Sequence, residues 1–145
     1  INAPPSTIAH ELFHKLDKGG TISAELSDSL IQDFVALNVR GGGNIKGYLV
    51  NEFPDAFTTN RRGKLVIKED YRSIGDILNG LSSGQVSYGY GHTKNYWAQS
   101  GALEAEAWAD FGRIYYDNKS DVIRMFEEIF PNLNKRAKEK LKEMI

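Results

Sequence analysis

The sequence predicts a mainly α-helical protein. At most a small sheet is expected, and only that sheet would make the protein α+β. Apolar residues recur every three or four positions in several long segments, which is the spacing of one helix face, whereas β-type runs are few and short. A length of 145 residues fits one domain. We therefore expect 1–145 to form a single domain. Because the chain begins with Ile rather than Met, we also expect it to be a fragment of a longer protein.

The first predicted helix covers about 7–18. Ser6 is a favourable N-cap, the apolar residues after it keep helical spacing, and Gly19-Gly20 ends the pattern. The same spacing predicts a second helix over about 23–38. Further helices are predicted over 71–81, 102–116, 120–130 and 132–144, the last two being separated by Pro131.

Strands are predicted only in the middle of the chain. Tyr48–Val50 and Lys64–Ile67 are short runs of β-type composition, and Asn60–Gly63 before the second run is typical of a turn. Gly41–Gly43 predicts a flexible loop, and the Gly/Tyr-rich stretch Ser87–His92 predicts another. This part of the chain therefore accounts for whatever small sheet is present.

The composition excludes several classes of function. With 18 basic and 19 acidic residues the net charge is −1, so no overall field attracts nucleic acid or anionic lipid, and we expect neither as a partner. No apolar run approaches the roughly 20 residues that span a bilayer, and the start lacks the features of a signal peptide. The chain contains no cysteine, so the ligands of any metal must be His, Asp or Glu.

The sharpest motif is His10-Glu11-Leu12-Phe13-His14, an H-E-x-x-H pattern inside a predicted helix. Histidines at positions i and i+4 lie one above the other on a helix, so both imidazoles can reach one zinc ion. Glu11 lies about 100° around the helix from His10, where it can accept a proton from metal-bound water. A random shuffle of these residues produces the motif with a probability on the order of a few in a thousand. We therefore expect His10 and His14 to be zinc ligands and Glu11 to be the catalytic base.

A catalytic zinc ion needs a third protein ligand and one open position. The candidates are His92, in a predicted loop, and Glu104 and Glu106 in the predicted helix 102–116. Residues 106 and 110 share a helix face, so Glu106 can bind the metal while Asp110 accepts a hydrogen bond from a ligand imidazole. Glu104 points about 200° away and is the weaker candidate.

The stretch Glu106-Ala-Trp-Ala-Asp110-Phe-Gly112 resembles the second motif of gluzincins, such as the thermolysin and lethal-factor families. In those families a helical Glu completes the zinc site, and an acidic residue four positions later supports a ligand histidine. The resemblance implies a zincin-like metallopeptidase fold that binds one Zn²⁺ per chain. It also implies that Glu106 is the third ligand and that Asp110 supports a histidine.

A second resemblance involves His10–Asp17, Tyr90–Trp97 and Gly101–Leu103 together with the Glu106 motif. This combination is similar to metallopeptidase-like domains encoded with phage minor head and head-morphogenesis proteins. The resemblance covers 7–18 and 88–131, and 20–86 carries little of it. Phe13 departs from the pattern, because many relatives have Gly there, and a ring at this position is expected to crowd the helix.

Three further residues are candidates for supporting roles. Gluzincins stabilise the oxyanion of the tetrahedral intermediate with a Tyr or His before the third-ligand helix, and Tyr96 and His92 both occupy that part of the chain. Tyr96 is favoured slightly because a neutral phenol donates a hydrogen bond without placing a charge beside zinc. Asp17, one turn beyond His14, is expected to accept a hydrogen bond from a ligand histidine or from a loop, or to be solvated.

These features predict a zinc-dependent endopeptidase that acts on a protein or peptide substrate. Two alternatives remain open at this stage, a non-enzymatic zincin-fold module of a phage head protein and a toxin-like effector peptidase. Phage structural proteins are possible partners in the first alternative. The sequence indicates no compartment beyond an expectation of solubility, with a cytoplasmic or virion-associated location if a phage encodes the chain.

Overall fold

A computed structural model describes residues 5–89 and 91–145 of the chain, and within them the protein is mainly helical with one small two-stranded sheet. The α-helices are α1 (Pro5–Leu16), α2 (Ser27–Gly41), α3 (Ile45–Glu52), α4 (Arg72–Leu81), α5 (Lys94–Trp97), α6 (Ala102–Asp117), α7 (Ser120–Ile129) and α8 (Pro131–Glu143). Short 3₁₀ helices are η1 (Lys18–Gly20), η2 (Ser23–Leu26), η3 (Pro54–Ala56) and η4 (Glu69–Tyr71). The strands are β1 (Phe57–Thr59) and β2 (Leu65–Ile67).

The predicted helices and the mainly helical class are confirmed, whereas one predicted strand is wrong. Tyr48–Val50 lies inside α3. The side chain of Asn44 accepts a hydrogen bond from the Gly47 N–H and so caps this helix, which lets Ile45 and Leu49, four residues apart, be buried on one face. A short helix with two buried apolar residues and a short strand are difficult to distinguish by composition.

The sheet is a single antiparallel hairpin in which Phe57 pairs with Ile67 and Thr59 with Leu65. The second predicted strand is therefore confirmed as β2, and the turn between the strands is closed by Asn60, whose side chain accepts hydrogen bonds from Arg62 and Lys64 N–H groups. The glycine loop predicted over Gly41–Gly43 starts one residue later in the structure. Gly41 is the last residue of α2, and Gly42, at φ 56°, caps the helix.

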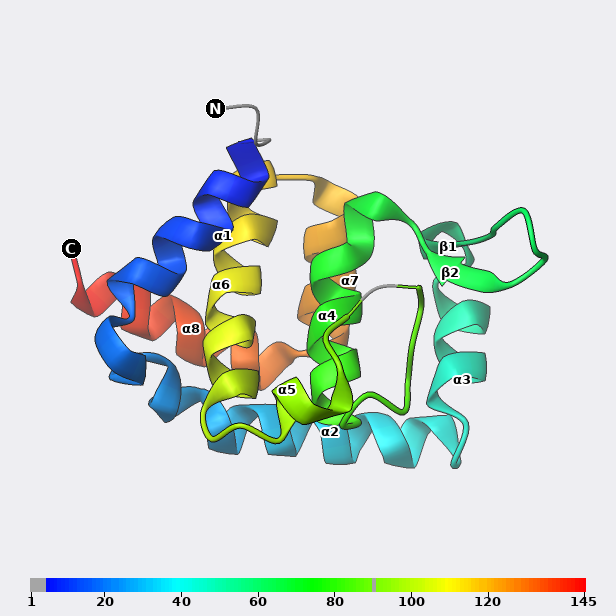
Figure 1. The fold of residues 1–145 in the computed structure, drawn as a ribbon, viewed down its shortest axis with the longest axis horizontal. Coiled ribbons are helices and arrows are strands. Elements are labelled where there is room, and N and C mark those ends of the chain that lie inside the picture. Colours follow the sequence, from blue (N-terminus) through cyan, green and yellow to red (C-terminus); the bar gives the residue numbers. More distant parts are fainter. Residues whose placement is uncertain (1–4, 90) are drawn as a thin grey trace.

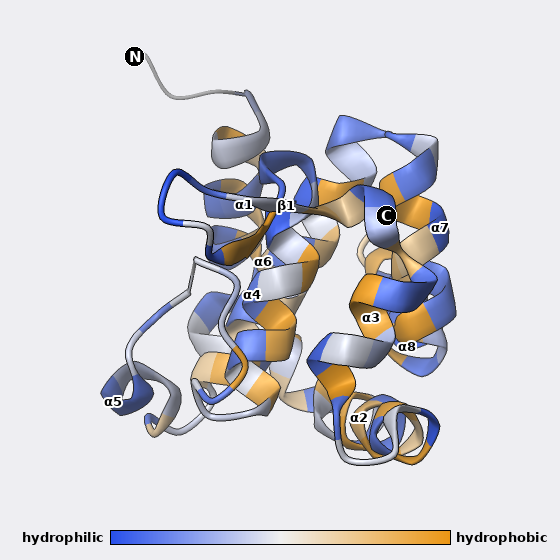
Figure 2. Ribbon diagram, turned by 90° about the vertical axis from the view of Figure 1, so that its right-hand side faces the viewer, coloured by the Kyte–Doolittle hydropathy of each residue, from blue (hydrophilic) through white to orange (hydrophobic). Residues whose placement is uncertain are grey.

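Helix α6 is the central element, packed against α1 on one side and α4 on the other (Figure 1). Its buried residues include Trp108 and Phe111, which stack with ring centroids 5.7 Å apart. Figure 2 shows apolar segments on the helices that face the interior and a hydrophilic hairpin turn at the edge. Among the described residues, no helix combines the length and apolar character needed to cross a membrane.

The contact between α1 and α6 is unusually close around Phe13. The Trp108 indole N–H donates a hydrogen bond of 3.0 Å to the Phe13 carbonyl, one of the carbonyls that the end of α1 leaves without a partner inside the helix. The Phe13 ring lies over Gly112, where an added Cβ would be 2.4 Å from the ring Cγ. The predicted crowding by Phe13 is therefore avoided because its neighbour on α6 has no side chain.

Candidate metal centre

Helices α1 and α6 bring His10, His14 and Glu106 together. His10 Nε2 lies 3.3 Å from Glu106 Oε1, and His14 Nε2 lies 2.9 Å from Glu106 Oε2. One ligand atom from each of these side chains lies within 4.8 Å of the other two, a separation that one metal ion can bridge. The α1–α6 packing thus converts an i, i+4 histidine pair and a distant glutamate into one set of donors.

The electrostatics of Glu106 favour its charged form. Burial by itself would raise the pKa of this carboxyl, which is only 5% exposed, but hydrogen bonds from His10, His14 and Tyr96 outweigh that cost and hold the pKa well below its usual range. Glu106 is therefore an ionised carboxylate in the interior. Such a group requires nearby positive charge or a cation.

Tyr96 and His92 reach the same carboxylate from the segment before α6. The Tyr96 hydroxyl donates a hydrogen bond of 2.9 Å to Glu106 Oε2, and His92 Nε2 lies 3.5 Å from Oε1. The two rings stack with centroids 3.9 Å apart. Burial and the hydrogen bond to Glu106 raise the pKa of Tyr96 above its ordinary value, so the phenol is a neutral donor at neutral pH.

Helix α5, absent from the sequence predictions, holds Tyr96 in place. Its N-cap is Thr93, whose side chain accepts a hydrogen bond from the Tyr96 N–H. The Trp97 indole N–H donates a 2.6 Å hydrogen bond to Asn79 of α4. A helix of one turn has no apolar periodicity, which explains why the sequence predicts no element over 94–97. Position 90 of the predicted Ser87–His92 loop, which is also the Tyr90 of the phage-domain motif, lies outside the described residues.

Asp110 is completely buried beside His10, with Oδ1 3.3 Å from His10 Nε2. This places the carboxylate next to the same imidazole nitrogen that faces Glu106. The structure therefore brings Asp110 to a histidine of the cluster, on the nitrogen that would bind a metal.

Asp76 of α4 is a site residue that the sequence analysis missed. It interacts directly with Asp110, and burial together with the charge of Asp110 raises the pKa of Asp76 to about 10. Burial also raises the pKa of Asp110. One signal was present in the sequence: Ser73, Asp76 and Asn79 form a polar series at intervals of three in an otherwise apolar helix.

A cavity of about 220 Å³ opens beside the cluster. Several water molecules would fit in such a volume. Its walls combine metal-binding groups with two arginines: His10, Arg72, Asp76, Gly91, His92, Glu106, Asp110 and Arg113. The cavity therefore borders His10 and Glu106, whereas Asp110 stays buried in its wall and His14 is not among its described lining residues.

Two predicted residues lie outside these contacts. Glu11 is an exposed residue of α1 and does not line the cavity. Asp17 is only 3% exposed, and its carboxylate accepts hydrogen bonds from the Ile22 N–H, the Ser23 N–H and the Ser23 hydroxyl. The loop is thus the partner of Asp17. A supporting role toward a ligand histidine is wrong, because both carboxylate oxygens are engaged by the turn after α1, and the solvated alternative is wrong as well.

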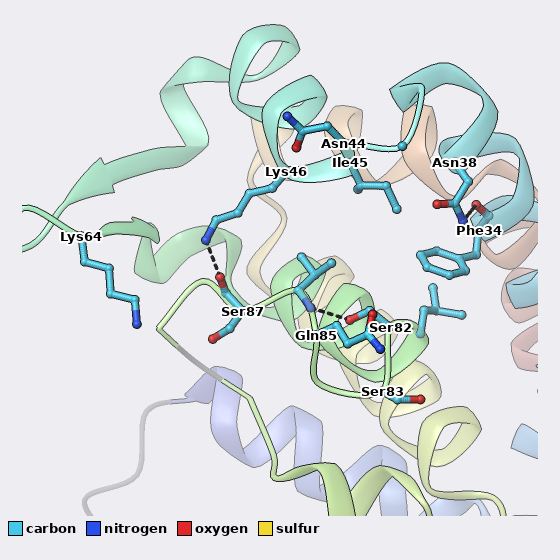
Figure 3. A pocket seen from close by; sticks show the side chains of 13 residues that line it. Phe34, Asn38, Asn44, Ile45, Lys46, Lys64, Ser82, Ser83, Gln85 and Ser87 are labelled. Carbon is cyan, nitrogen blue, oxygen red and sulfur yellow. Dashed lines mark hydrogen bonds between the residues drawn. The ribbon is translucent and has the colours of Figure 1, made fainter.

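A roomier cavity of about 770 Å³ lies elsewhere, between α2, α3 and the segment after α4 (Figure 3). Its charged residues are Lys46 and Lys64, and the Lys46 ammonium donates a 2.8 Å hydrogen bond to the Ser87 carbonyl. No acid or histidine is among its described lining residues, so they supply neither metal ligands nor a proton acceptor for hydrolysis.

Comparison with known proteins adds no assignment. No protein-family model, curated protein or solved structure matches the chain. The chemistry of the donor cluster is therefore the basis for a functional proposal.

Proposed function

We propose that the chain is a zinc-dependent endopeptidase domain of zincin-like fold, in which His10, His14 and Glu106 hold one zinc ion. The observation that carries this proposal is the convergence of three donor atoms, from two helices distant in sequence, within 4.8 Å of one another. Two imidazoles and one carboxylate form a ligand set that catalytic zinc uses.

The donors present fit this metal. Glu106 is buried and ionised, His14 retains a side-chain exposure of 28%, and the adjacent cavity leaves room for a further ligand. A structural zinc site instead has four protein ligands and is closed. When bound, zinc supplies a Lewis acid that polarises a carbonyl and lowers the pKa of coordinated water.

The remaining residues are assigned to proton transfer and to charge stabilisation. Glu11, an exposed residue that follows His10 in α1, is assigned to take the proton from the attacking water and to give it to the leaving amine. Tyr96 donates its hydroxyl hydrogen bond to the substrate oxyanion in place of Glu106, and His92 is the alternative donor. Asp110 lies beside His10 Nε2, the nitrogen assigned to zinc, so it adds negative charge next to the ligand set and does not accept a hydrogen bond from the zinc-bound nitrogen.

The proposed substrate is a protein or peptide. The resemblance of 7–18 and 88–131 favours a phage structural protein as the partner. A toxin-like effector peptidase would use the same zinc chemistry on a different protein substrate. A purely structural module has no use for a glutamate directly after His10 in the H-E-x-x-H motif, which favours an enzyme.

The zinc content of the purified domain is the direct test. Elemental analysis is expected to find about one zinc per chain in the wild type and little in His10→Ala or Glu106→Ala, because each change removes a ligand. Glu104→Ala is the matched control, since this residue lies on the same helix outside the cluster. A wild type that stays zinc-free after reconstitution would point to a non-enzymatic module.

Tyr96→Phe separates the two oxyanion candidates. Loss of the hydroxyl is expected to lower kcat by about 10²-fold with little change in KM, because the hydrogen bond acts mainly in the transition state. Steady-state kinetics on any peptide that the wild type cleaves provides the measurement. If Tyr96→Phe keeps its kcat while His92→Ala loses it, the oxyanion role passes to His92.

A further inference from the structure

Behind the proposed zinc ligands lies a second group of metal-binding donors. His10, Asp76, Glu106 and Asp110 each offer one ligand atom, and these atoms lie within 4.8 Å of one another. His10 and Glu106 belong to both groups, whereas Asp76 and Asp110 belong only to this inner one. Asp76 comes from α4, so a third helix contributes to the centre.

Asp110 gives an independent indication that something is bound there. Both of its carboxylate oxygens are shielded from solvent and accept no hydrogen bond of good geometry, although Asp76 and Ser73 lie within interaction range and the side chain lines the cavity. Buried polar atoms almost always have a partner, because desolvating them without one is costly. A cation between Asp110 and its neighbours would supply that partner.

The gathering of carboxyl groups around one cavity also favours a cation site. Three carboxyl groups, those of Asp76, Glu106 and Asp110, line the cavity, and one oxygen of each lies within 4.8 Å of the others. Arg113 faces them, and its Nε is likewise buried without a hydrogen bond. Arg72 also lines the cavity but pairs with Glu69 at 3.0 Å. One arginine thus faces three carboxyl groups, and two of these, Asp76 and Asp110, interact directly with each other.

The two oxygens of Glu106 face different groups. Oε2 lies 2.9 Å from both His14 Nε2 and the Tyr96 hydroxyl. Oε1 lies 3.3 Å from His10 Nε2, which is in turn 3.3 Å from Asp110 Oδ1. Glu106 is thus placed to give one oxygen to an outer cation and the other to an inner one.

We propose that the centre holds a second divalent cation, bound by Asp76 and Asp110 and sharing Glu106 with the zinc ion as a bridging ligand. This inference rests on the proposed function. His10 Nε2, the nitrogen that faces both Glu106 and Asp110, is assigned to the zinc ion. An oxygen-rich ligand set suits Mn²⁺ or Mg²⁺ better than the His-rich outer set does. In aminopeptidases and phosphatases, paired cations of this kind stabilise the attacking oxygen and the leaving oxygen of a displacement reaction.

The test measures how many Mn²⁺ ions bind to each chain of the zinc-loaded protein. The domain carrying zinc is titrated with MnCl₂, free Mn²⁺ is measured by electron paramagnetic resonance, and zinc is measured in the same sample. The wild type is expected to take up about one Mn²⁺ per chain without losing zinc. Asp76→Asn is expected to weaken manganese binding by at least about tenfold with zinc unchanged. Asp28→Asn, at an exposed position of α2, is the matched control and should behave as the wild type.

Several outcomes would overturn the second site. Zinc binding without manganese uptake, manganese uptake that equals zinc loss, or equal uptake by Asp76→Asn would each leave a single-metal centre and the proposed function intact. A wild type that binds no zinc would instead remove the proposed function as well. Circular dichroism checks folding, and Asp76→Ser replaces the asparagine variant if that variant does not fold.

Discussion

Glu11→Gln is expected to reduce peptide hydrolysis by about 10²–10⁴-fold while leaving one zinc ion bound per chain. The amide keeps the size and polarity of the carboxylate but cannot accept the proton from the attacking water. Glu11 is an exposed residue outside the donor cluster, so its replacement removes no ligand and no buried contact. The measurement combines cleavage of a peptide library, read by mass spectrometry, with elemental analysis of zinc.

The control for this prediction is Glu127→Gln, an equivalent change at an exposed position of α7. It should retain both activity and zinc. Glu11→Gln with the activity of the wild type would remove the proton-transfer role of this residue. Loss of zinc from the same variant would instead show that Glu11 takes part in binding the metal.

Gly112→Ala is expected to destabilise the protein by about 1–3 kcal/mol and to weaken zinc binding. Its Cβ would lie 2.4–2.6 Å from three ring atoms of Phe13, far inside contact distance. Either the ring or the whole of α1 must move, and α1 carries His10 and His14. Alanine normally stabilises a helix by up to about 1 kcal/mol relative to glycine, so the sign of the change is diagnostic. Urea unfolding gives the stability, and zinc titration gives the affinity.

A second substitution tests whether the clash is the cause. Phe13→Ala removes the ring, so adding Gly112→Ala to that variant should cost much less than it does in the wild type. Gly41→Ala is the matched control, because a Cβ at this helical glycine makes only ordinary contacts, the nearest at 3.6 Å. Equal effects of Gly112→Ala with and without Phe13 would show that the close approach does not determine the geometry of α1.

The sequence predicted helices best where many apolar residues repeat on one face. The segments that became α1, α4, α6, α7 and α8 were all recognised within a few residues of their ends. Short elements were not distinguished, since α3 was predicted in part as a strand and no element was predicted over α5. These helices have one or two turns, and their conformation depends on capping by Asn44 and Thr93 more than on periodicity.

The candidate site was predictable to the extent that its residues are close in sequence. His10 and His14 are one helical turn apart, so their shared face follows from helix geometry alone. The pairing of Phe13 with Gly112 was not predictable, because each residue explains the other only after α1 and α6 are packed. Asp17 is similar, since its partners at Ile22 and Ser23 depend on the path of the turn.

By itself, the sequence determined the helical class and the H-E-x-x-H pair, because both depend on spacings of three to five residues. The tertiary structure brought Glu106, which the sequence analysis preferred to Glu104, next to those histidines, and it alone showed that Asp76 joins them from α4. Which carboxylates meet depends on how three helices pack around the Trp108 and Phe111 core. That packing is set by the shapes of side chains far apart in the chain, and no local pattern records it.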